Sequence, residues 1–282
     1  MYVVSLPHRT FSLIFAIFLA LSFNVSANSD GRYALVIGNS AYENAAPLVN
    51  PKNDSRDIAQ TLETLYFETV LLQDATKLQI ELSVKEFLQK LKEDEDSVGL
   101  FYYAGHGVQL QGDNYLVPIE TNSGTEQDIK RQSYNVANLL NGMRKIKSAT
   151  NIIIMDACRN NPFGHLAGKG TRSAGGDSRA LVRMTIPKLD TGLSKLDAPP
   201  NTLIAFATAP GRVALDGDGG NSPYTEKLIN SMQRTGLTIG EVFRQVRENV
   251  LDVSKGSQIP WESSSLVKDF YFKPRSAIPI GF

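Results

Sequence analysis

Residues 152–161 read Ile-Ile-Ile-Met-Asp-Ala-Cys-Arg-Asn-Asn, an apolar run followed by a mostly polar one. The apolar half predicts a buried β-strand, and the polar half contains Asp156 and Cys158, the single cysteine among 282 residues. A second apolar run ends at Phe-Tyr-Tyr-Ala-Gly-His-Gly, residues 101–107, which predicts that His106 lies on a small, flexible turn just past a strand end. If the two strands are neighbours, an imidazole and a thiol lie at the same edge of one sheet.

Apolar strand-type runs alternate with helix-type stretches along the chain, which is typical of a mostly parallel α/β sheet. We expect strands at 33–38, 68–73, 98–103, 151–155, 202–207 and 270–272. Helices are expected at 54–65, 76–91, 135–146, about 223–233 and 239–253, and a hairpin is expected to join 109–110 to 115–119. His106 and Cys158 fall at carboxyl ends of strands, where open α/β sheets place their functional crevice.

The pairing of one histidine with one cysteine suggests nucleophilic catalysis. A thiol near its free pKa is only a few per cent thiolate at neutral pH, so a cysteine nucleophile gains from an imidazole that stabilises its ionised form or takes its proton. Backbone N–H groups of Gly107 and Cys158 could then face the oxyanion of a tetrahedral intermediate, and a side chain at Gly107 would crowd the scissile bond. Taken alone, each residue is more often structural, and their joint context favours a catalytic dyad.

These motifs resemble those of the caspase and metacaspase superfamily of clan CD cysteine peptidases, including bacterial caspase-like p20-domain proteins. Asp-Ala-Cys-Arg-Asn is similar to the family's Gln-Ala-Cys-Arg-Gly, and 52 residues separate His106 from Cys158, close to the family's spacing of roughly 50 residues. Tyr-Ala-Gly-His-Gly is similar to Ser-Gly-His-Gly, and residues 206–211 resemble the Tyr-Ser-Thr-Ala-Pro-Gly segment that precedes a substrate-binding loop in caspases.

The resemblance extends from about Arg32 to the C-terminus and carries expectations for the whole molecule. It implies an α/β caspase-hemoglobinase fold, in which helices cover both faces of a mostly parallel six-stranded sheet. It also implies a protein or peptide substrate and chemistry that needs no cofactor.

Two acidic residues suggest the specificity. Asp156 stands two positions before Cys158, so on an extended segment it points to the same side as the nucleophile and can border the pocket for the P1 residue, the S1 pocket. Asp54 resembles a second S1 acid of metacaspases, although a helix N-cap would explain it equally well. Two carboxylates would favour an Arg or Lys side chain through charge-assisted hydrogen bonds.

Some positions depart from the metacaspase pattern. Ala104 stands where that family has a serine, which removes one possible S1 hydrogen bond, and the turn at Asp113 is too short to supply the aspartates of calcium-responsive members. The Gly-rich segment 216–221 lacks the Gly and Glu of an EF-hand loop and is better explained as a mobile turn beside the pocket. One cysteine and few histidines disfavour a zinc site, so no metal is expected. Trp261 is expected in the core rather than in a substrate subsite.

The composition and the first residues indicate the setting. With 29 basic and 29 acidic residues the chain has no strong field for a polyanion, so we expect no nucleic-acid partner. Residues 1–27 have the charge, apolar run and cleavage site of a secretory signal peptide, which leaves 28–282 as the peptidase domain, periplasmic or secreted. We expect no stable membrane association after cleavage; the alternative is an uncleaved membrane anchor. The Gly-rich segment 163–200 is expected to be a flexible insertion that the enzyme cuts in itself.

The sequence therefore predicts a cysteine endopeptidase that cleaves after Arg or Lys, with Cys158 as nucleophile, His106 as base and Asp156 with Asp54 in the S1 pocket. The alternative from another class is a catalytically silent caspase-like scaffold that binds peptides or partner proteins, for which Ala104 leaves room. A third interpretation is a caspase that cleaves after acidic residues and binds them through Arg212, which an acid at position 156 disfavours.

Overall fold

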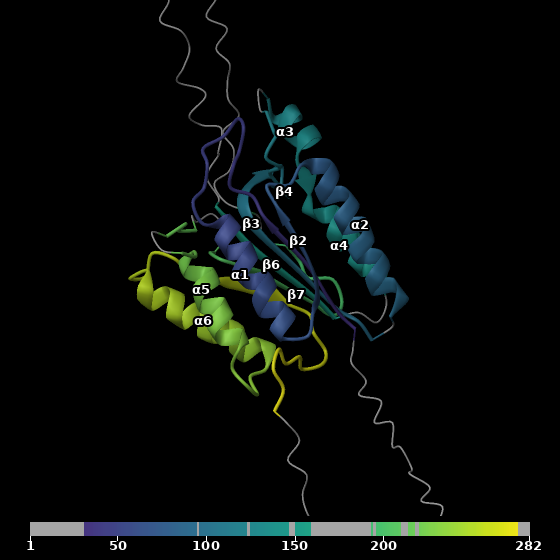
Figure 1. Cartoon of the computed structure of the whole chain (residues 1–282), viewed down its shortest axis with the longest axis vertical. Coiled ribbons are helices and arrows are strands. Elements are labelled where there is room, and N and C mark those ends of the chain that lie inside the picture. Colours follow the sequence, from purple (N-terminus) through teal and green to yellow (C-terminus); the bar gives the residue numbers. More distant parts are fainter. Residues whose placement is uncertain are drawn as a thin grey trace, which may run out of the picture.

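A computed structural model describes residues 31–94, 96–122, 125–146, 150–158, 193, 196–209, 214–217 and 220–275. The main sheet has the strand order β2-β1-β3-β6-β7-β8 (Figure 1). Its strands are β1 (Arg32–Gly38), β2 (Glu68–Gln73), β3 (Val98–Leu110), β6 (Thr150–Cys158), β7 (Thr202–Phe206) and β8 (Trp261–Ser264). All neighbours in this order are parallel except β8, which pairs with β7 in the antiparallel sense. The mostly parallel six-stranded sheet expected from the sequence is confirmed.

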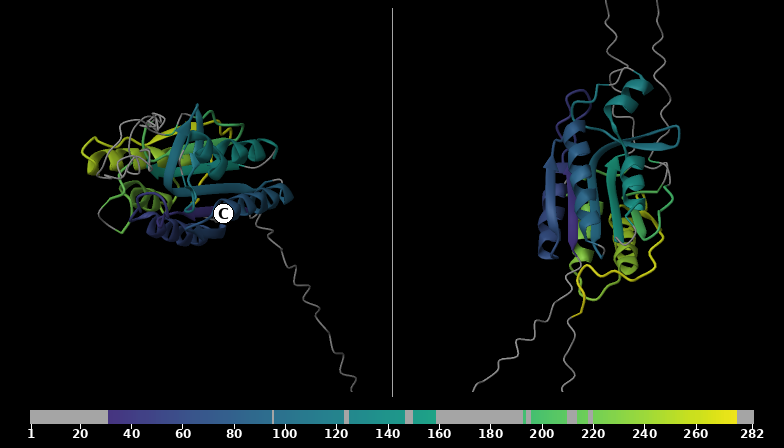
Figure 2. Two further views of the ribbon diagram at one scale, coloured as in Figure 1. Left: turned by 90° about the horizontal axis from the view of Figure 1, so that it is seen from above. Right: turned by 90° about the vertical axis from the view of Figure 1, so that its right-hand side faces the viewer.

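Helices cover both faces of the sheet. Figure 1 shows α1 (Pro51–Thr64), α5 (Pro223–Met232) and α6 (Ile239–Val253) on one side, and α2 (Lys77–Glu93) and α4 (Val136–Arg144) on the other. The view from above keeps the same separation of the two helix layers (Figure 2). The arrangement is the three-layer α/β architecture that the alternation of strand-type and helix-type segments predicts.

The central strand β6 supplies apolar side chains to both faces in turn. Ile152 and Ile154 pack in the core under α1, α5 and α6, whereas Ile153 and Met155 pack in the core under α2 and α4. A strand that is buried on both faces must be apolar at every position, which explains the continuous run of residues 152–155. Asp156 follows in the same alternation as Ile152 and Ile154, so it emerges on the face covered by α1 and α5.

The starts of the helices follow from local chemistry. Thr76 and Thr238 form capping boxes with Gln79 and Glu241 at the beginnings of α2 and α6. Ser222 caps α5 by accepting a hydrogen bond from the backbone N–H of Thr225. The predicted helices are confirmed to within a few residues, except that the first begins earlier, at Pro51 rather than at residue 54.

The third strand is longer than predicted. β3 continues to Leu110 and forms a hairpin with β4 (Asp113–Leu116), which in turn pairs with the short strand β5 (Tyr134–Asn135). His106 therefore lies within a strand, and the expectation of a turn there was wrong. Gly105 makes the extension possible, because its φ of +151° is a conformation that side chains disfavour.

Three other expectations were also wrong or incomplete. The last strand is β8 and not 270–272; Phe270 and Phe272 instead pack in the core, and Tyr271 forms only an isolated bridge. Trp261 lies on the edge strand with 42% of its surface exposed, so it is not a core residue. Helix α3 (Glu126–Gln132) and strand β5 were not anticipated, because both are too short to show a clear periodicity.

The signal peptide predicted at residues 1–27, Arg212 and nearly all of the insertion predicted at 163–200 lie outside the described residues. No helix in the described part of the chain combines the length and the apolar character needed to cross a bilayer.

We expect Gly105→Ala to lower the free energy of unfolding by about 1–3 kcal/mol, because the substitution combines backbone strain with steric overlap. A Cβ atom at Gly105 would lie 2.6 Å from the hydroxyl of Tyr42 and 2.8 Å from that of Tyr103. The matched control is Gly240→Ala in α6, where a Cβ meets nothing within 4 Å and alanine should be neutral or slightly stabilising. Urea unfolding measures both; equal stabilities of the two variants would contradict the strain at Gly105.

Candidate active site

The pairing of β3 with β6 brings the two predicted catalytic positions together. In this parallel ladder the Cα register partner of Cys158 is His106, and that of Asp156 is Ala104. All four residues lie toward the carboxyl ends of the two strands, the edge at which open α/β sheets bind their ligands. The sheet thus places an imidazole-bearing residue beside the cysteine position, 52 residues apart in the chain.

The backbone of His106 is held from two directions. Its N–H donates to the Tyr42 hydroxyl at 2.7 Å, and its carbonyl accepts from the Tyr103 hydroxyl at 2.8 Å and from the N–H of Val117 at 3.0 Å. The Tyr42 ring also packs on the imidazole, with 4.4 Å between ring centroids. The position of the histidine is therefore set by buried aromatic residues and not by a flexible turn.

The imidazole of His106 has one nitrogen bound and one free. Nε2 lies 2.7 Å from the carbonyl oxygen of Ala46, and because a carbonyl only accepts, this contact assigns the proton to Nε2. Nδ1 is buried and has no hydrogen-bond partner among the described residues. Burial lowers the pKa of His106, while the Ala46 carbonyl and the charge of Asp216 act in the opposite direction. At neutral pH the group is a neutral imidazole whose Nδ1 lone pair can take a proton.

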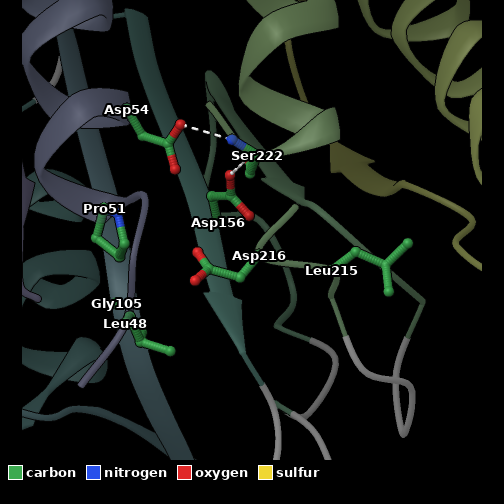
Figure 3. Close-up of a pocket in the computed structure, with 8 residues that line it drawn as sticks. All are labelled: Leu48, Pro51, Asp54, Gly105, Asp156, Leu215, Asp216 and Ser222. Atoms are coloured by element: carbon green, nitrogen blue, oxygen red, sulfur yellow. Dashed lines mark hydrogen bonds between the residues drawn. The ribbon is translucent and has the colours of Figure 1, made fainter. Parts of the chain in front are cut away.

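Beside the histidine, three aspartates line one narrow pocket. Asp54 comes from α1, Asp156 from β6 and Asp216 from the segment before α5, and Ser222 and Gly105 complete part of the wall (Figure 3). The close-up shows the three carboxylates directed toward a common space. The structure thus brings Asp54 and Asp156 together at one pocket, and their role in binding a P1 residue stays a prediction.

Asp156 forms the floor of this polar cluster. Its carboxylate accepts hydrogen bonds from the hydroxyl of Ser222 and, at 2.9 Å, from that of Thr225. The Thr225 hydroxyl also lies 2.6 Å from that of Tyr102, which extends the network beneath the pocket. Burial raises the pKa of Asp156 to about 6, although the two hydroxyl donors favour the charged form.

Asp54 lies on the opposite wall and faces the start of α5. Its Oδ1 accepts a hydrogen bond of 2.8 Å from the backbone N–H of Ser222. Burial, followed by the negative charge of Asp156, raises the pKa of Asp54 to about 8. The alternative that Asp54 caps its own helix is wrong, because α1 begins at Pro51 and the carboxylate contacts another element.

Gly107 has a packing role in the structure. A Cβ atom there would lie 3.1 Å from a methyl group of Leu193 and 3.3 Å from Ala157, so a small residue is needed whether or not a substrate is bound. The role of its N–H in an oxyanion hole stays a prediction.

Asp216 and Ser222 were not predicted as pocket residues. Asp216 is an acid at the start of a Gly-rich segment, and the sequence predicts only a mobile turn beside the pocket there. Ser222 is followed by proline, a pattern that predicts the start of a helix. This local pattern does not predict that the helix start contacts two aspartates. Within the described ranges, no cluster of three or more His, Cys, Asp or Glu residues is arranged to hold a metal ion.

We expect Asp54→Asn to stabilise the protein in a pH-dependent manner. The native carboxyl keeps its proton up to about pH 8, whereas in the unfolded chain it ionises near pH 3.8, so the native state binds the extra proton between these values. The wild type therefore loses stability as the pH rises through this window, and asparagine removes that loss. The gain should be small near pH 4 and reach about 1 kcal/mol or more at pH 8, roughly 2–4 °C in Tm.

Thermal unfolding at pH 4, 6 and 8 provides the measurement. The matched control is Asp57→Asn on the same helix, where the carboxylate pairs with Arg56 near the surface. A difference in Tm between Asp54→Asn and wild type that does not change with pH would show that Asp54 is ionised throughout.

The comparisons with known proteins agree with this geometry. A family model described as the caspase domain matches residues 31–271. The chain is 27% identical to human mucosa-associated lymphoid tissue lymphoma translocation protein 1 over 224 residues, which is 79% of this chain and 22% of that protein. It is 23% identical to mouse caspase-1 over 250 residues, 86% of this chain and 60% of that protein. The chain therefore spans only part of the length of these curated relatives, and it belongs to the caspase-domain family of cysteine peptidases.

Proposed function

We propose that this chain is a cysteine endopeptidase that cleaves peptide bonds after Arg or Lys, with Cys158 as nucleophile and His106 as its acid–base partner. Membership of the caspase-domain family supports peptidase chemistry on protein substrates. The observation that carries the basic-P1 specificity is the pocket next to His106 that is lined by Asp54, Asp156 and Asp216.

A pocket of this kind favours a cation for electrostatic reasons. Asp54 and Asp156 are 1% and 7% exposed, so the negative charge of Asp156 is shielded from water and repels a second negative charge on Asp54. A guanidinium or ammonium group removes that repulsion and offers several N–H donors to the carboxylates. A carboxylate side chain at P1 would add a further negative charge to the same space.

In the proposed acylation step, Nδ1 of His106 takes the proton of the Cys158 thiol, and the resulting thiolate attacks the carbonyl carbon of the scissile peptide bond. The negative charge moves to the carbonyl oxygen, which the N–H groups of Gly107 and Cys158 would stabilise. The C–N bond then breaks, and the leaving nitrogen takes the proton from Nδ1 of the His106 imidazolium. A free amine departs and a thioester remains on Cys158.

In the deacylation step, Nδ1 of His106 removes a proton from water, and the resulting hydroxide attacks the thioester carbonyl. The carbon–sulfur bond breaks, the carboxylic acid product leaves, and the thiol and imidazole are restored. The contact between Nε2 and the Ala46 carbonyl supports this role, because it leaves Nδ1 as the exchanging nitrogen in both steps.

We further propose that the chain acts outside the cytoplasm, in the periplasm or after secretion. The signal-peptide pattern of residues 1–27 supports this location, and the domain would then begin near residue 28. A reactive thiol in an oxidising compartment is prone to oxidation, so we expect the activity to depend on reductant.

The first test removes each member of the dyad. Cys158→Ala and His106→Ala should each lower kcat/KM by ~10³-fold or more, and the double variant should be no worse than either single one, because the two groups act as a unit. Fluorogenic peptides measure turnover, and Tm confirms folding. Near-wild-type activity in Cys158→Ala or His106→Ala would refute the assignment, and an inactive wild type would favour the silent scaffold.

The second test concerns specificity. Asp156→Asn keeps the shape of the side chain and removes its charge, so kcat/KM for Arg and Lys substrates should fall by at least about tenfold, which is roughly 1.4 kcal/mol of transition-state stabilisation. A citrulline substrate, an uncharged analogue of the Arg peptide, should lose less. The wild-type preference for Arg over citrulline should also grow as the pH rises from 5 to 8, because the pocket carboxyls lose their protons in that range.

An equal loss for charged and uncharged substrates would mean that Asp156 supports the geometry of the site and does not read the P1 residue. Preferential cleavage of a peptide with Asp at P1 would instead support the interpretation as a caspase with acidic specificity.

A further inference from the structure

The Asp216 carboxylate accepts hydrogen bonds from the backbone of the segment before α1. Its two carboxylate oxygens accept hydrogen bonds from consecutive backbone N–H groups, from Val49 at 2.8 Å and from Asn50 at 3.3 Å. Asp216 therefore does more than border a space for substrate. It joins a segment that precedes α5 to a segment that precedes α1, more than 160 residues away in the chain.

Asn50 makes the same connection in the opposite direction. Its side-chain N–H₂ donates to the backbone carbonyls of Asp216 and, at 3.1 Å, of Gly217. Asn50 occupies the N-cap position of α1, yet its side chain makes no capping hydrogen bond there, and the residue is fully buried. Two side chains and two stretches of backbone thus form a reciprocal clamp, which we call the 49–216 clamp: Val49 and Asn50 on one side, Asp216 and Gly217 on the other.

The clamp lies close in the chain to Ala46, the residue that holds the imidazole of His106. Ala46, whose carbonyl binds Nε2 of His106, stands three residues before Val49 in a segment without helix or strand. Ala46, Pro47 and Val49 are exposed, and the apolar packing of this segment comes from its partly buried residues Ala45 and Leu48. Within residues 46–50, the described backbone N–H hydrogen bonds are that from Leu48 to the Ser40 carbonyl, at 3.1 Å, and those from Val49 and Asn50 to Asp216.

The charge of Asp216 acts on the same ring. Its negative field raises the pKa of His106 and so opposes the effect of burial, as does the Ala46 carbonyl. Loss of the Asp216 carboxylate would therefore destabilise the protonated imidazole of His106 in two ways. It would remove a nearby negative charge, and it would release the segment that positions the Ala46 carbonyl.

We propose that Asp216 is a positioning residue for His106, and that it acts through the 49–216 clamp by holding the Ala46 carbonyl against Nε2. The inference rests on the proposed function, since it gives a second role to a residue of the proposed S1 pocket. It implies that Asp216 affects the thiolate–imidazolium pair even when no P1 side chain is present.

Alkylation of the enzyme by iodoacetamide tests this without a peptide substrate. The chain has a single cysteine, so the rate reports Cys158 alone, and its dependence on pH reports how well His106 stabilises the thiolate. We expect Asp216→Asn to react about three- to tenfold more slowly than wild type between pH 6 and 7, with the rise in rate displaced to higher pH. Asp57→Asn is the control for loss of one carboxylate and should follow the wild-type profile.

A peptide assay separates the two roles of Asp216. Asp216→Asn should lower kcat for the citrulline substrate as well as for the Arg substrate, because His106 acts on both. Asp156→Asn should mainly affect the Arg substrate. If Asp216→Asn lowers turnover of the Arg peptide alone and leaves the alkylation profile unchanged, Asp216 is only a pocket residue and the inference fails.

Two further variants keep the outcome decisive. His106→Ala must displace the alkylation profile toward that of a free thiol, near pH 8.5; if it does not, the proposed dyad fails, which is a different result from failure of the clamp. Asn50→Ala removes the side-chain half of the clamp, the hydrogen bonds to the carbonyls of Asp216 and Gly217, without changing any charge. It should displace the profile in the same direction as Asp216→Asn, by a smaller amount, with Tm as the check on folding. A wild-type profile in folded Asn50→Ala would overturn positioning through the clamp.

Discussion

The parallel pairing of β3 with β6 is the constraint on which the site depends. Nine consecutive register pairs, from Val98 with Thr150 to His106 with Cys158, bring together two segments that are remote in the chain. A slip of one residue in this ladder would move every side chain of β6 to the opposite face. Ile152 and Ile154 would then leave their core, so the packing energy of the sheet also maintains the position of Asp156.

That packing also explains how a cluster of aspartates is tolerated. Burial raises the pKa of both Asp54 and Asp156, and the charge of Asp156 raises that of Asp54 further, so the empty pocket is destabilised as the pH rises and both carboxyls ionise. The start of α5 compensates in part: the backbone N–H of Ser222 donates to Asp54, and its hydroxyl donates to Asp156. Helix N-termini favour negative charge, so one helix end serves both walls. A cationic ligand would complete this compensation, which is a physical reason for the proposed basic specificity.

Much of this arrangement follows from local sequence, and the rest does not. The continuous apolar run at 152–155 and the alternation of elements were sufficient to predict the sheet, because buried parallel strands and capped helices leave strong local patterns. The path of β3 beyond Tyr103 was missed, since Gly105 and Gly107 read as a turn, whereas Gly105 adopts an extended conformation with positive φ inside the strand. The role of Asp216 was missed because its contacts are to backbone N–H groups, which carry no residue-specific signal.

The group that binds the imidazole of His106, the Ala46 carbonyl, lies in a loop and not in a helix or strand. In many hydrolases a carboxylate orients the catalytic imidazole and stabilises its charged form. Here a backbone carbonyl, that of Ala46, takes the orienting role, and a carbonyl carries no net charge. The position of the ring then depends on the path of an exposed segment, and the compensating negative charge must come from a neighbour. Asp216 meets both needs, because its carboxylate binds that segment while its field reaches the ring. Under the proposed function, substrate selection and acid–base chemistry would thus share one carboxylate, so a change in the charge of Asp216 would also alter the behaviour of His106.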